Sequence, residues 1–275
     1  MALSRAERIS AGCVQIFVKN NMRWLGSPPG PDEAAGFAAD RERAGFKAVF
    51  GHAGYLINLG GPPSHNRAKS VQSLIQEISF ADALGLPFLV LHPGAHLGAG
   101  EERGLELIVA GLDEALAETK GSGVRLALEN TAGQGTCLGH KIEHLAAIFD
   151  AVRQPERLGL CLDTAHLFAA GFDLRTGKGW DAAIAKVEKL IGLKEILAFH
   201  INDSKTGPGS RVDRHEHIGM GKIGLEGFRH IVNDARFLET PGCLETPKSD
   251  DLHEDMENLA VLHALAHRAF STDDD

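Results

Sequence analysis

Short apolar runs alternate along this chain with longer amphipathic segments. Seven of the runs predict strands, over Cys13 to Val18, Phe46 to Phe50, Pro87 to Leu91, Val124 to Leu128, Leu158 to Leu162, Ile196 to Ile201 and Gly242 to Leu244. Apolar residues at three- and four-residue spacing predict helices over Asp32 to Ala44, Ala68 to Leu84, Glu101 to Thr119, Ile142 to Val152, Asp181 to Leu190 and Asp251 to His267. Such alternation requires crossover connections and therefore a parallel sheet that is covered on both faces.

Two architectures fit this pattern, a closed (β/α)8 barrel and an open doubly wound sheet. Histidines or carboxylates follow nearly every strand, as catalytic residues do in barrel enzymes, whereas an open sheet would concentrate such residues at one crevice. The pattern therefore favours an α/β fold of the TIM-type (β/α)8 barrel class. A helical segment from Leu3 to Ser10 precedes the first strand, so we expect a barrel that lacks its first strand at the N-terminus. No composition break divides the chain, and we expect residues 1–275 to form a single domain.

Composition and short motifs exclude several classes of function. The 28 basic and 37 acidic side chains give a net charge of −9, so any contact with nucleic acid must be local. No apolar run reaches the roughly 20 residues of a membrane-spanning helix, and charged residues near the start interrupt any secretory signal core. The sequence contains neither GxxxxGK[ST] nor a GxGxxG after a strand, and no GxSxG, so we expect no nucleotide cofactor and no serine hydrolase.

Cysteine usage indicates a reducing environment. The four cysteines are far apart and form no CxxC pair; they are Cys13, Cys137, Cys161 and Cys243. This spacing predicts neither a disulfide framework nor a zinc ribbon, and it fits a cytoplasmic protein. Cys161 and Cys243 each precede a polar strand-end residue by two positions, so we expect both to pack inside the barrel.

Five histidines and four carboxylates lie at or just after the ends of predicted strands or in the long loop from Asn202 to Gly224. They are His52, His92, Glu129, Asp163, His166, His200, Asp213, His215 and Glu245. Nitrogen and oxygen donors without a thiolate suit a catalytic zinc or manganese ion rather than a structural zinc site. Nine donors exceed what one ion uses, so two or three ions that share a carboxylate are indicated. Clustered divalent ions suit the hydrolysis of a phosphodiester, because they activate water and neutralise charge on the attacking and leaving oxygens.

Each donor also has an ordinary structural explanation. A single strand-end histidine such as His52 or His92 is more often a hydrogen-bonded structural residue than a metal ligand. Asp163 is equally suited to capping the next helix, with His166 on its first turn, and Asp213 with His215 equally suits a solvated turn. The prediction of a metal centre therefore depends on the whole set.

Eight strings of the sequence occur in an order typical of one family, and they are QIFVKNNMRW, GHAGYLINL, HPGAH, ENTAGQG, CLDTAH, HINDSK, DRHEHIG and LETP. From Leu3 to the final helix, the chain resembles the endonuclease IV family, metal-dependent endonucleases that act at abasic sites in DNA. The resemblance implies a trinuclear zinc cluster, with manganese as an alternative at one site. By this resemblance, one ion is held by His52, His92 and Glu129, a second by Glu129, Asp163, His200 and Glu245, and a third by His166, Asp213 and His215.

The resemblance also implies a reaction and a substrate. A monomeric enzyme of this kind cleaves double-stranded DNA on the 5′ side of an abasic site, which leaves a 3′-hydroxyl and a 5′-deoxyribose phosphate, and it trims blocked 3′ ends. Water activated by the ions is the expected nucleophile, with Glu245 and Glu129 as the catalytic carboxylates.

The expected DNA contacts follow from the same resemblance. Arg23, Tyr55 and Leu56 would insert into the stack of bent DNA, although Tyr55 and Leu56 are also compatible with an ordinary core. The candidate phosphate contacts are Lys205 and Arg214, together with Lys19, Arg211 and Lys222.

The chain departs from the family pattern in its missing first strand and at Met220, where many relatives carry an acidic residue. Two other functions stay open at this point. A sugar isomerase or epimerase on a related barrel would use one or two metals and fewer ligands. A DNA-lesion binding protein with an incomplete barrel would bind without cleaving.

Overall fold

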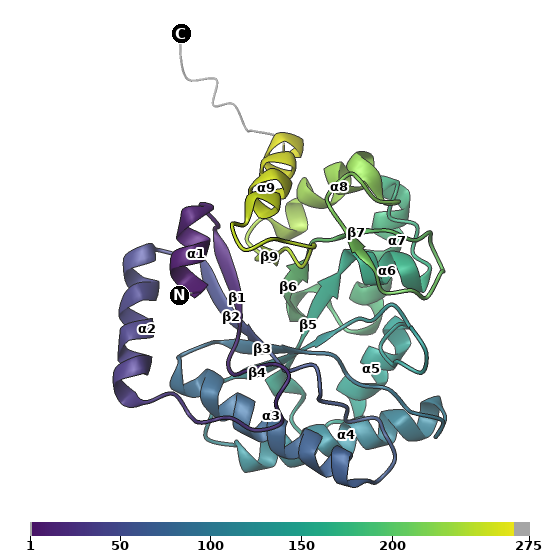
Figure 1. The fold of residues 1–275 in the computed structure, drawn as a ribbon. Helices are drawn as coiled ribbons and strands as arrows, with labels where there is room; N and C mark the ends of the chain where they lie inside the picture. The colour runs from purple at the N-terminus through teal and green to yellow at the C-terminus, as the bar shows by residue number, and fades with distance from the viewer. Residues whose placement is uncertain (1, 267–275) are drawn as a thin grey trace.

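Seven parallel strands form one sheet in the computed structural model, which describes residues 2–266. The strands are β1 (Cys13–Phe17), β2 (Ala48–His52), β3 (Phe88–Leu91), β4 (Arg125–Glu129), β5 (Leu158–Asp163), β6 (Ile196–His200) and β9 (Gly242–Cys243). Each strand pairs with the next in this order, and the sheet curls into a nearly closed barrel with the helices around it (Figure 1). The predicted barrel that lacks one strand is confirmed.

Several strands end later than the sequence predicts. β2 runs to His52 and β4 to Glu129, because parallel pairing with neighbouring strands continues to these residues. β5 likewise includes Asp163, which is paired in register with His200 at the end of β6. Three of the predicted donors, His52, Glu129 and Asp163, are therefore the last residues of strands rather than residues of the following loops.

Nine helices occur among residues 2–266, and none of them combines the length and apolar character needed to cross a bilayer. They are α1 (Ala2–Arg8), α2 (Pro31–Ala44), α3 (His65–Ala83), α4 (Glu101–Glu118), α5 (Ile142–Ala151), α6 (Thr164–Ala170), α7 (Gly177–Leu190), α8 (Gly224–Val232) and α9 (His253–Leu265). Short 3-10 turns lie at Pro155–Arg157, Leu193–Glu195 and Ala235–Phe237. The predicted end of the last helix at His267 lies outside the described residues.

Capping residues account for two differences from the predicted helix starts. The Ser64 side chain accepts a hydrogen bond from the backbone N–H of Arg67, so α3 begins three residues before the predicted Ala68. The Thr176 side chain accepts from the backbone N–H of Gly179, so α7 begins before the predicted Asp181. The sequence reading missed α6 and α8, which are both short.

Two apolar cores fill the fold. The larger core lies between the sheet and the surrounding helices. The smaller core fills the barrel and consists of Phe50, Phe88, Val90, Ala127, Cys161, Ala198 and Cys243. Its two aromatic rings, Phe50 and Phe88, are stacked with their centroids 4.6 Å apart. The predicted burial of Cys161 and Cys243 in the barrel is confirmed. The polar strand-end residues lie beyond this smaller core, at the carboxyl ends of the strands.

The barrel has a seam between its first and last strands. Within residues 2–266, no backbone ladder joins β1 to β9. Side chains span the seam instead, because the Cys13 thiol donates to the carbonyl oxygen of Gly242 (3.2 Å) and Gln15 Nε2 donates to Glu245 Oε1 (2.8 Å). A cavity of about 290 Å³ lies at the seam, bordered by residues of α1 and α9.

Candidate metal centre

The carboxylate of Glu129 lies at the centre of the cluster at the carboxyl end of the barrel. Its Oε2 is 2.9 Å from His92 Nε2 and 3.3 Å from His52 Nε2. Its Oε1 is 3.0 Å from His200 Nδ1 and 3.2 Å from His166 Nδ1. Glu129 is fully buried. Its Oε2 faces His92 and His52, and its Oε1 faces His200 and His166.

A second group forms around His200. The donor atoms of Glu129, Asp163, His200 and Glu245 lie within 4.8 Å of one another, as do those of His52, His92 and Glu129. His200 Nδ1 is 3.2 Å from Glu245 Oε2 and 3.9 Å from Asp163 Oδ2. Glu129 belongs to both groups, which is the arrangement expected of a shared carboxylate.

A third group lies where the long loop meets α6. Asp213 Oδ1 is 3.3 Å from His166 Nε2 and 3.5 Å from His215 Nε2, and the two ring nitrogens are 3.4 Å apart. Asp163 Oδ2 is 3.7 Å from His215 Nε2. Asp163 also caps α6 by accepting a hydrogen bond from the backbone N–H of His166 (2.7 Å). Asp163 can therefore be both a helix cap and a candidate metal ligand.

The donor distances fit small divalent cations. Ligand atoms of a tetrahedral zinc ion lie about 3.3 Å apart, given zinc–ligand distances of about 2.0–2.1 Å. The three mutual distances among Asp213, His166 and His215 are 3.3–3.5 Å. All nine predicted residues are brought together by the fold, and each of the three groups combines histidine nitrogen with carboxylate oxygen.

The hydrogen bonds of four of the five histidines leave one ring nitrogen facing the centre. His52 Nδ1 bonds to the carbonyl oxygen of Ala53 (2.7 Å), and His166 Nδ1 to that of Asn130 (2.9 Å). A carbonyl oxygen can only accept, so these Nδ1 atoms carry hydrogen and the Nε2 atoms are free to act as ligands. His215 Nδ1 bonds in the same way to the carbonyl oxygen of Glu245 (3.2 Å).

Gln15 on β1 completes this pattern for His200. Its amide oxygen accepts from His200 Nε2 (2.8 Å), and its amide nitrogen donates to Glu245 Oε1 (2.8 Å). The Nδ1 lone pair of His200 is therefore the one that faces Glu129 and Glu245. The sequence reading missed Gln15, because nothing in the string CVQIF distinguishes it from an ordinary strand residue.

Two buried asparagines orient the carboxylates. Asn202 Nδ2 donates to Asp163 Oδ2 (2.6 Å), and Asn202 Oδ1 accepts from the backbone N–H of Glu245 (2.7 Å). Asn130 Oδ1 accepts from the backbone N–H of Asp163 (2.7 Å). Both asparagines directly follow or nearly follow predicted strands, so the strand-end rule that found the donors could also have found them.

The charges in the cluster shift the pKa of its groups. Burial alone would raise the pKa of Glu129, but the positive charges of His92 and His200 outweigh burial and hold it well below the usual range. Burial alone would lower the pKa of His166, but Asp163 and other carboxylates raise it well above the usual range. Glu129 and His166, whose Oε1 and Nδ1 atoms lie 3.2 Å apart, therefore each favour the charged form of the other.

The loop that carries Asp213 and His215 is built around a buried carboxylate. It contains a hairpin of β7 (Asp203–Ser204) and β8 (His215–Glu216), where the sequence predicted irregular chain. Asp203 accepts from five backbone N–H groups, which are those of Ser204, Gly219, Gly221, Ile223 and Gly224. A Cβ at Gly221 would collide with this carboxylate, so the position requires glycine. Asp203 thus fixes both ends of the loop.

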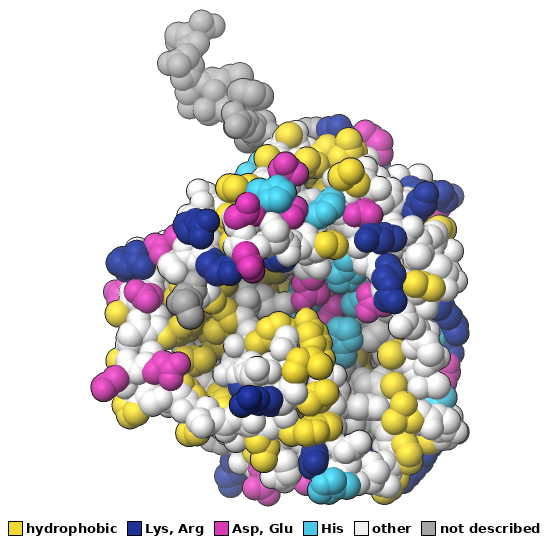
Figure 2. All heavy atoms as spheres, viewed as in Figure 1, with side chains coloured by type: hydrophobic (Ala, Val, Ile, Leu, Met, Phe, Trp, Pro, Cys, Tyr) yellow, Lys and Arg dark blue, Asp and Glu magenta, His cyan; other side chains and the backbone are white. Residues whose placement is uncertain are grey.

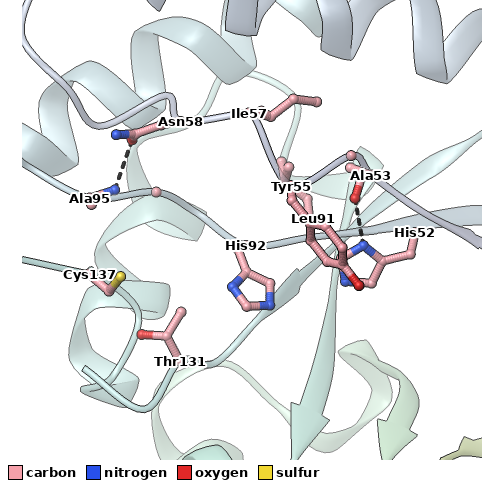
Figure 3. A pocket seen from close by; sticks show the side chains of 12 residues that line it. His52, Ala53, Tyr55, Ile57, Asn58, Leu91, His92, Ala95, Thr131 and Cys137 are labelled. Carbon is pink, nitrogen blue, oxygen red and sulfur yellow. Dashed lines mark hydrogen bonds between the residues drawn. The ribbon is translucent and has the colours of Figure 1, made fainter. Parts of the chain in front are cut away.

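The donors line a cavity that opens to solvent. It has a volume of about 360 Å³ and is lined by Phe17, His52, Tyr55, His92, His166, Asp213, His215, Glu245 and Lys248. Figure 2 shows histidine and carboxylate side chains gathered in a hollow of this face, with lysine and arginine side chains beside it. An adjoining cavity of about 210 Å³ shares His52, Tyr55 and His92 (Figure 3).

Tyr55 stands at the rim of this cavity. Its side chain is 64% exposed, and its ring centroid is 6.2 Å from that of His52 and 5.2 Å from that of Phe17. Leu56 is partly buried, and Arg23 is exposed. Tyr55 therefore is not an ordinary core residue, and Phe17 is a neighbour that the sequence reading missed.

The basic residues predicted to contact phosphate divide into two groups. Lys205 and Arg211 are exposed on the long loop, which also carries Arg214 and Lys222 and the exposed Met220. Lys19 was also expected to contact phosphate, and this prediction is wrong. Its side chain is only 4% exposed, and its Nζ lies 2.9 Å from the buried carboxylate of Glu77 on α3.

Comparisons with known proteins agree on one family. The family model described as a xylose isomerase-like TIM barrel matches residues 3–265. A probable endonuclease 4 of Chloroflexus aurantiacus is 45% identical over 98% of this chain and 94% of its own length. One of Geobacter sulfurreducens is 46% identical over 97% of this chain and 90% of its own length.

Solved structures separate the family from the wider fold. Endonuclease IV from Thermus thermophilus superposes with a TM-score of 0.83 at 35% identity, and the match covers 96% of this chain and 92% of that chain. A xylose isomerase domain protein from Planctomyces limnophilus gives a TM-score of 0.69 at 18% identity, over 96% of this chain and 91% of that chain. The second likeness shows the fold alone.

Proposed function

Because the chain belongs to the endonuclease IV family, we propose that it hydrolyses the phosphodiester on the 5′ side of an abasic site in double-stranded DNA. The products are a 3′-hydroxyl and a 5′-deoxyribose phosphate. The observation that carries the proposal is the third donor group, in which Asp213, His166 and His215 lie 3.3–3.5 Å from one another. A sugar isomerase with one or two metals has no use for this additional group.

The proposed metal ligands follow the three donor groups. His52, His92 and Glu129 hold one zinc ion, and His166, Asp213 and His215 hold another. Glu129, Asp163, His200 and Glu245 would hold the remaining ion. Manganese is an alternative at one of the sites. When bound, such ions lower the pKa of water towards about 7 and offset charge on phosphate oxygens.

Glu129 and Glu245 have different roles in this scheme. Glu129 is fully buried and joins two donor groups, because one of its oxygens lies against His92 and the other against His200. The Glu245 side chain is 24% exposed and lines the open cavity. Since Gln15 fixes its Oε1, the Glu245 carboxylate is held in place to accept a hydrogen bond from a water and to orient that water towards the phosphorus.

Tyr55, Leu56 and Arg23 are proposed to recognise the lesion. Tyr55 is exposed at the rim of the cavity that the donors line. An abasic nucleotide lacks the base pairing that resists extrusion, and an aromatic side chain can fill the space of the absent base. The backbone N–H of Tyr55 donates to the carbonyl oxygen of Asn21 (3.2 Å), so the segment that carries Tyr55 and the segment that carries Arg23 would act together.

Lys205 and Arg214 are proposed to bind phosphates beside the cavity. The backbone N–H of Lys205 donates to the carbonyl oxygen of Arg214 (3.0 Å), so both side chains project from one hairpin. The positive side chains of Lys205 and Arg214 would attract DNA phosphates locally, although the net charge of −9 of the whole chain repels DNA. The same centre would trim blocked 3′ ends. We also propose that residues 1–275 act as one domain and as a monomer in the cytoplasm.

A nicking assay tests the proposal. A duplex labelled at one 5′ end and carrying a single abasic analogue is incubated with the zinc-supplemented protein, and an undamaged duplex of the same sequence is the control. We expect one nick on the 5′ side of the lesion and no nick in the control. Tight binding to the lesion without a nick would favour the silent lesion-binding function instead.

A further inference from the structure

Two thiols face each other across the seam of the barrel. Cys13 lies on β1 and Cys243 on β9, and their Sγ atoms are 3.6 Å apart. We propose that this pair is a redox modification site, at which a peroxide converts the two thiols into a disulfide that links β1 to β9. The inference does not depend on the proposed nuclease function.

The geometry favours a bond between these two sulfurs. A disulfide requires an S–S distance of about 2.05 Å, so the sulfurs must approach by less than the diameter of one atom. Both cysteines begin in the reduced form. Within the described residues, no backbone ladder joins β1 to β9, so no ladder between these two strands has to break as the bond forms.

A cavity gives a small oxidant access to the pair. The seam cavity of about 290 Å³ is lined by both cysteines, and Cys13 is partly exposed. Cys161 is fully buried in the barrel core. Cys137 lines the separate cavity beside His92. Cys13 and Cys243 are therefore the pair that combines access with a facing thiol.

The chemistry is balanced with hydrogen peroxide as the oxidant. The Cys13 sulfur attacks one peroxide oxygen; the S–O bond forms, the O–O bond breaks, and the departing oxygen takes the thiol proton and leaves as water. The Cys243 sulfur then attacks the Cys13 sulfur; the S–S bond forms, the S–O bond breaks, and a second water leaves with the Cys243 proton. The two thiols lose two electrons, which reduce the peroxide to two waters, and a dithiol reductant reverses the change.

The position of the bond gives it a structural consequence. Gln15 and Glu245 each lie two residues beyond a cysteine of the pair, and their side chains are hydrogen-bonded across the same seam. A disulfide would add a reversible covalent connection between the first and last strands to the side-chain contacts that already join them. Because the link closes a loop of most of the chain, it restricts the unfolded state and raises the midpoint of thermal unfolding.

The test counts thiols in the full-length, zinc-supplemented protein. After treatment with a small excess of hydrogen peroxide, we expect the free thiols of the denatured protein to fall from four to two. Peptide mapping should identify a Cys13–Cys243 cross-link within one chain. The midpoint of thermal unfolding should rise by about 5–10 °C and return after dithiothreitol.

Single substitutions provide matched controls. Cys13→Ser and Cys243→Ser should each keep all remaining thiols after the same treatment, whereas Cys137→Ser should still lose two. Retention of all four thiols in the unsubstituted protein, or a cross-link that involves any other cysteine, would overturn the proposal. If a seam variant does not fold, peptide mapping of the unsubstituted protein decides the question alone.

Discussion

Glu77 and Lys19 form an ion pair that is almost completely removed from solvent. Glu77 Oε1 lies 2.9 Å from Lys19 Nζ, and the two side chains are 1% and 4% exposed. Glu77 Oε2 accepts from the backbone N–H of Gly54 (2.9 Å), and Lys19 Nζ donates to the carbonyl oxygen of Arg23 (2.5 Å). The pair therefore ties α3 to both segments that carry the proposed lesion contacts.

Replacing Glu77 should weaken both the fold and lesion recognition. Glu77→Gln leaves the Lys19 ammonium buried without its counter-ion, and we expect a loss of about 3 kcal/mol in the free energy of unfolding. The loosened segments should raise KM for an abasic duplex more than they lower kcat. Urea unfolding and steady-state nicking kinetics measure the two effects.

Glu102→Gln, on the exposed face of α4, is the matched control and should change neither quantity. A Glu77→Gln protein whose stability is reduced while its KM is unchanged would show that the ion pair serves the fold alone.

Gln15 should control metal affinity without being a ligand. Its amide fixes the ring orientation of His200 and the carboxylate of Glu245. Groups that orient metal ligands typically contribute about 10–100-fold to metal affinity or activity, so Gln15→Ala should weaken zinc binding by about that factor in a chelator competition. Gln72→Ala, on the surface of α3, should bind zinc as the unsubstituted protein does. Equal zinc affinity in both variants would remove Gln15 from the centre.

The sequence predicts the donors well because of a simple geometric rule. Parallel strands end on the same side of a barrel, so polar residues at the ends of apolar runs converge there. His52 and Glu129 are 77 residues apart, yet their side chains lie 3.3 Å apart because each is the last residue of a strand. The strand ends therefore show where His52 and Glu129 meet, whereas Asp213 and His215 reach the same place from the long loop.

The sequence fails where a contact depends on packing between elements. Lys19 resembles any exposed lysine in the sequence, and its partner Glu77 lies in the middle of a helix without a local signal. Likewise, Cys13 and Cys243 are 230 residues apart and meet because the first and last strands of a curled sheet are neighbours. The first pairing follows from packing of the segment after β1 against α3 and the second from the curling of the sheet, and no local pattern encodes either.

Tyr55 should contribute to recognition and little to stability. The side chain is largely exposed, so Tyr55→Ala should change the free energy of unfolding by no more than about 0.5 kcal/mol. Loss of the ring that fills the abasic space should raise KM about tenfold, which corresponds to about 1.4 kcal/mol. Leu238→Ala, another exposed apolar side chain, serves as the control. An unchanged KM would exclude Tyr55 from the DNA contact.

Metal removal should abolish cleavage reversibly. Prolonged treatment with EDTA or phenanthroline, followed by dialysis, should give a protein without nicking activity, and added zinc should restore it. The metal content must be verified by elemental analysis at each stage, since buried sites release ions slowly. Full cleavage by protein shown to be metal-free would contradict the proposed mechanism.

Substitutions in the third donor group should release one zinc ion without affecting the other two donor groups. Asp213→Asn removes the charge of the only carboxylate among three donors that lie 3.3–3.5 Å apart, and His215→Ala deletes one of the two ring nitrogens, while the other two groups keep all of their donors. We therefore expect each variant to lose about one bound zinc ion of three. An ion at a phosphoryl site contributes several kcal/mol to stabilising the transition state, so the nicking rate should fall by about 1,000-fold.

Asp173→Asn makes the same chemical change at a carboxylate that is paired with Arg175 outside the cavity, and it should retain full metal content and activity. The combination of outcomes distinguishes the candidate functions. Loss of one zinc ion with a large loss of nicking supports a three-ion nuclease. Unchanged zinc content and unchanged nicking in both Asp213→Asn and His215→Ala would reject the third site, and with it the feature that sets this centre apart from an isomerase with one or two metals.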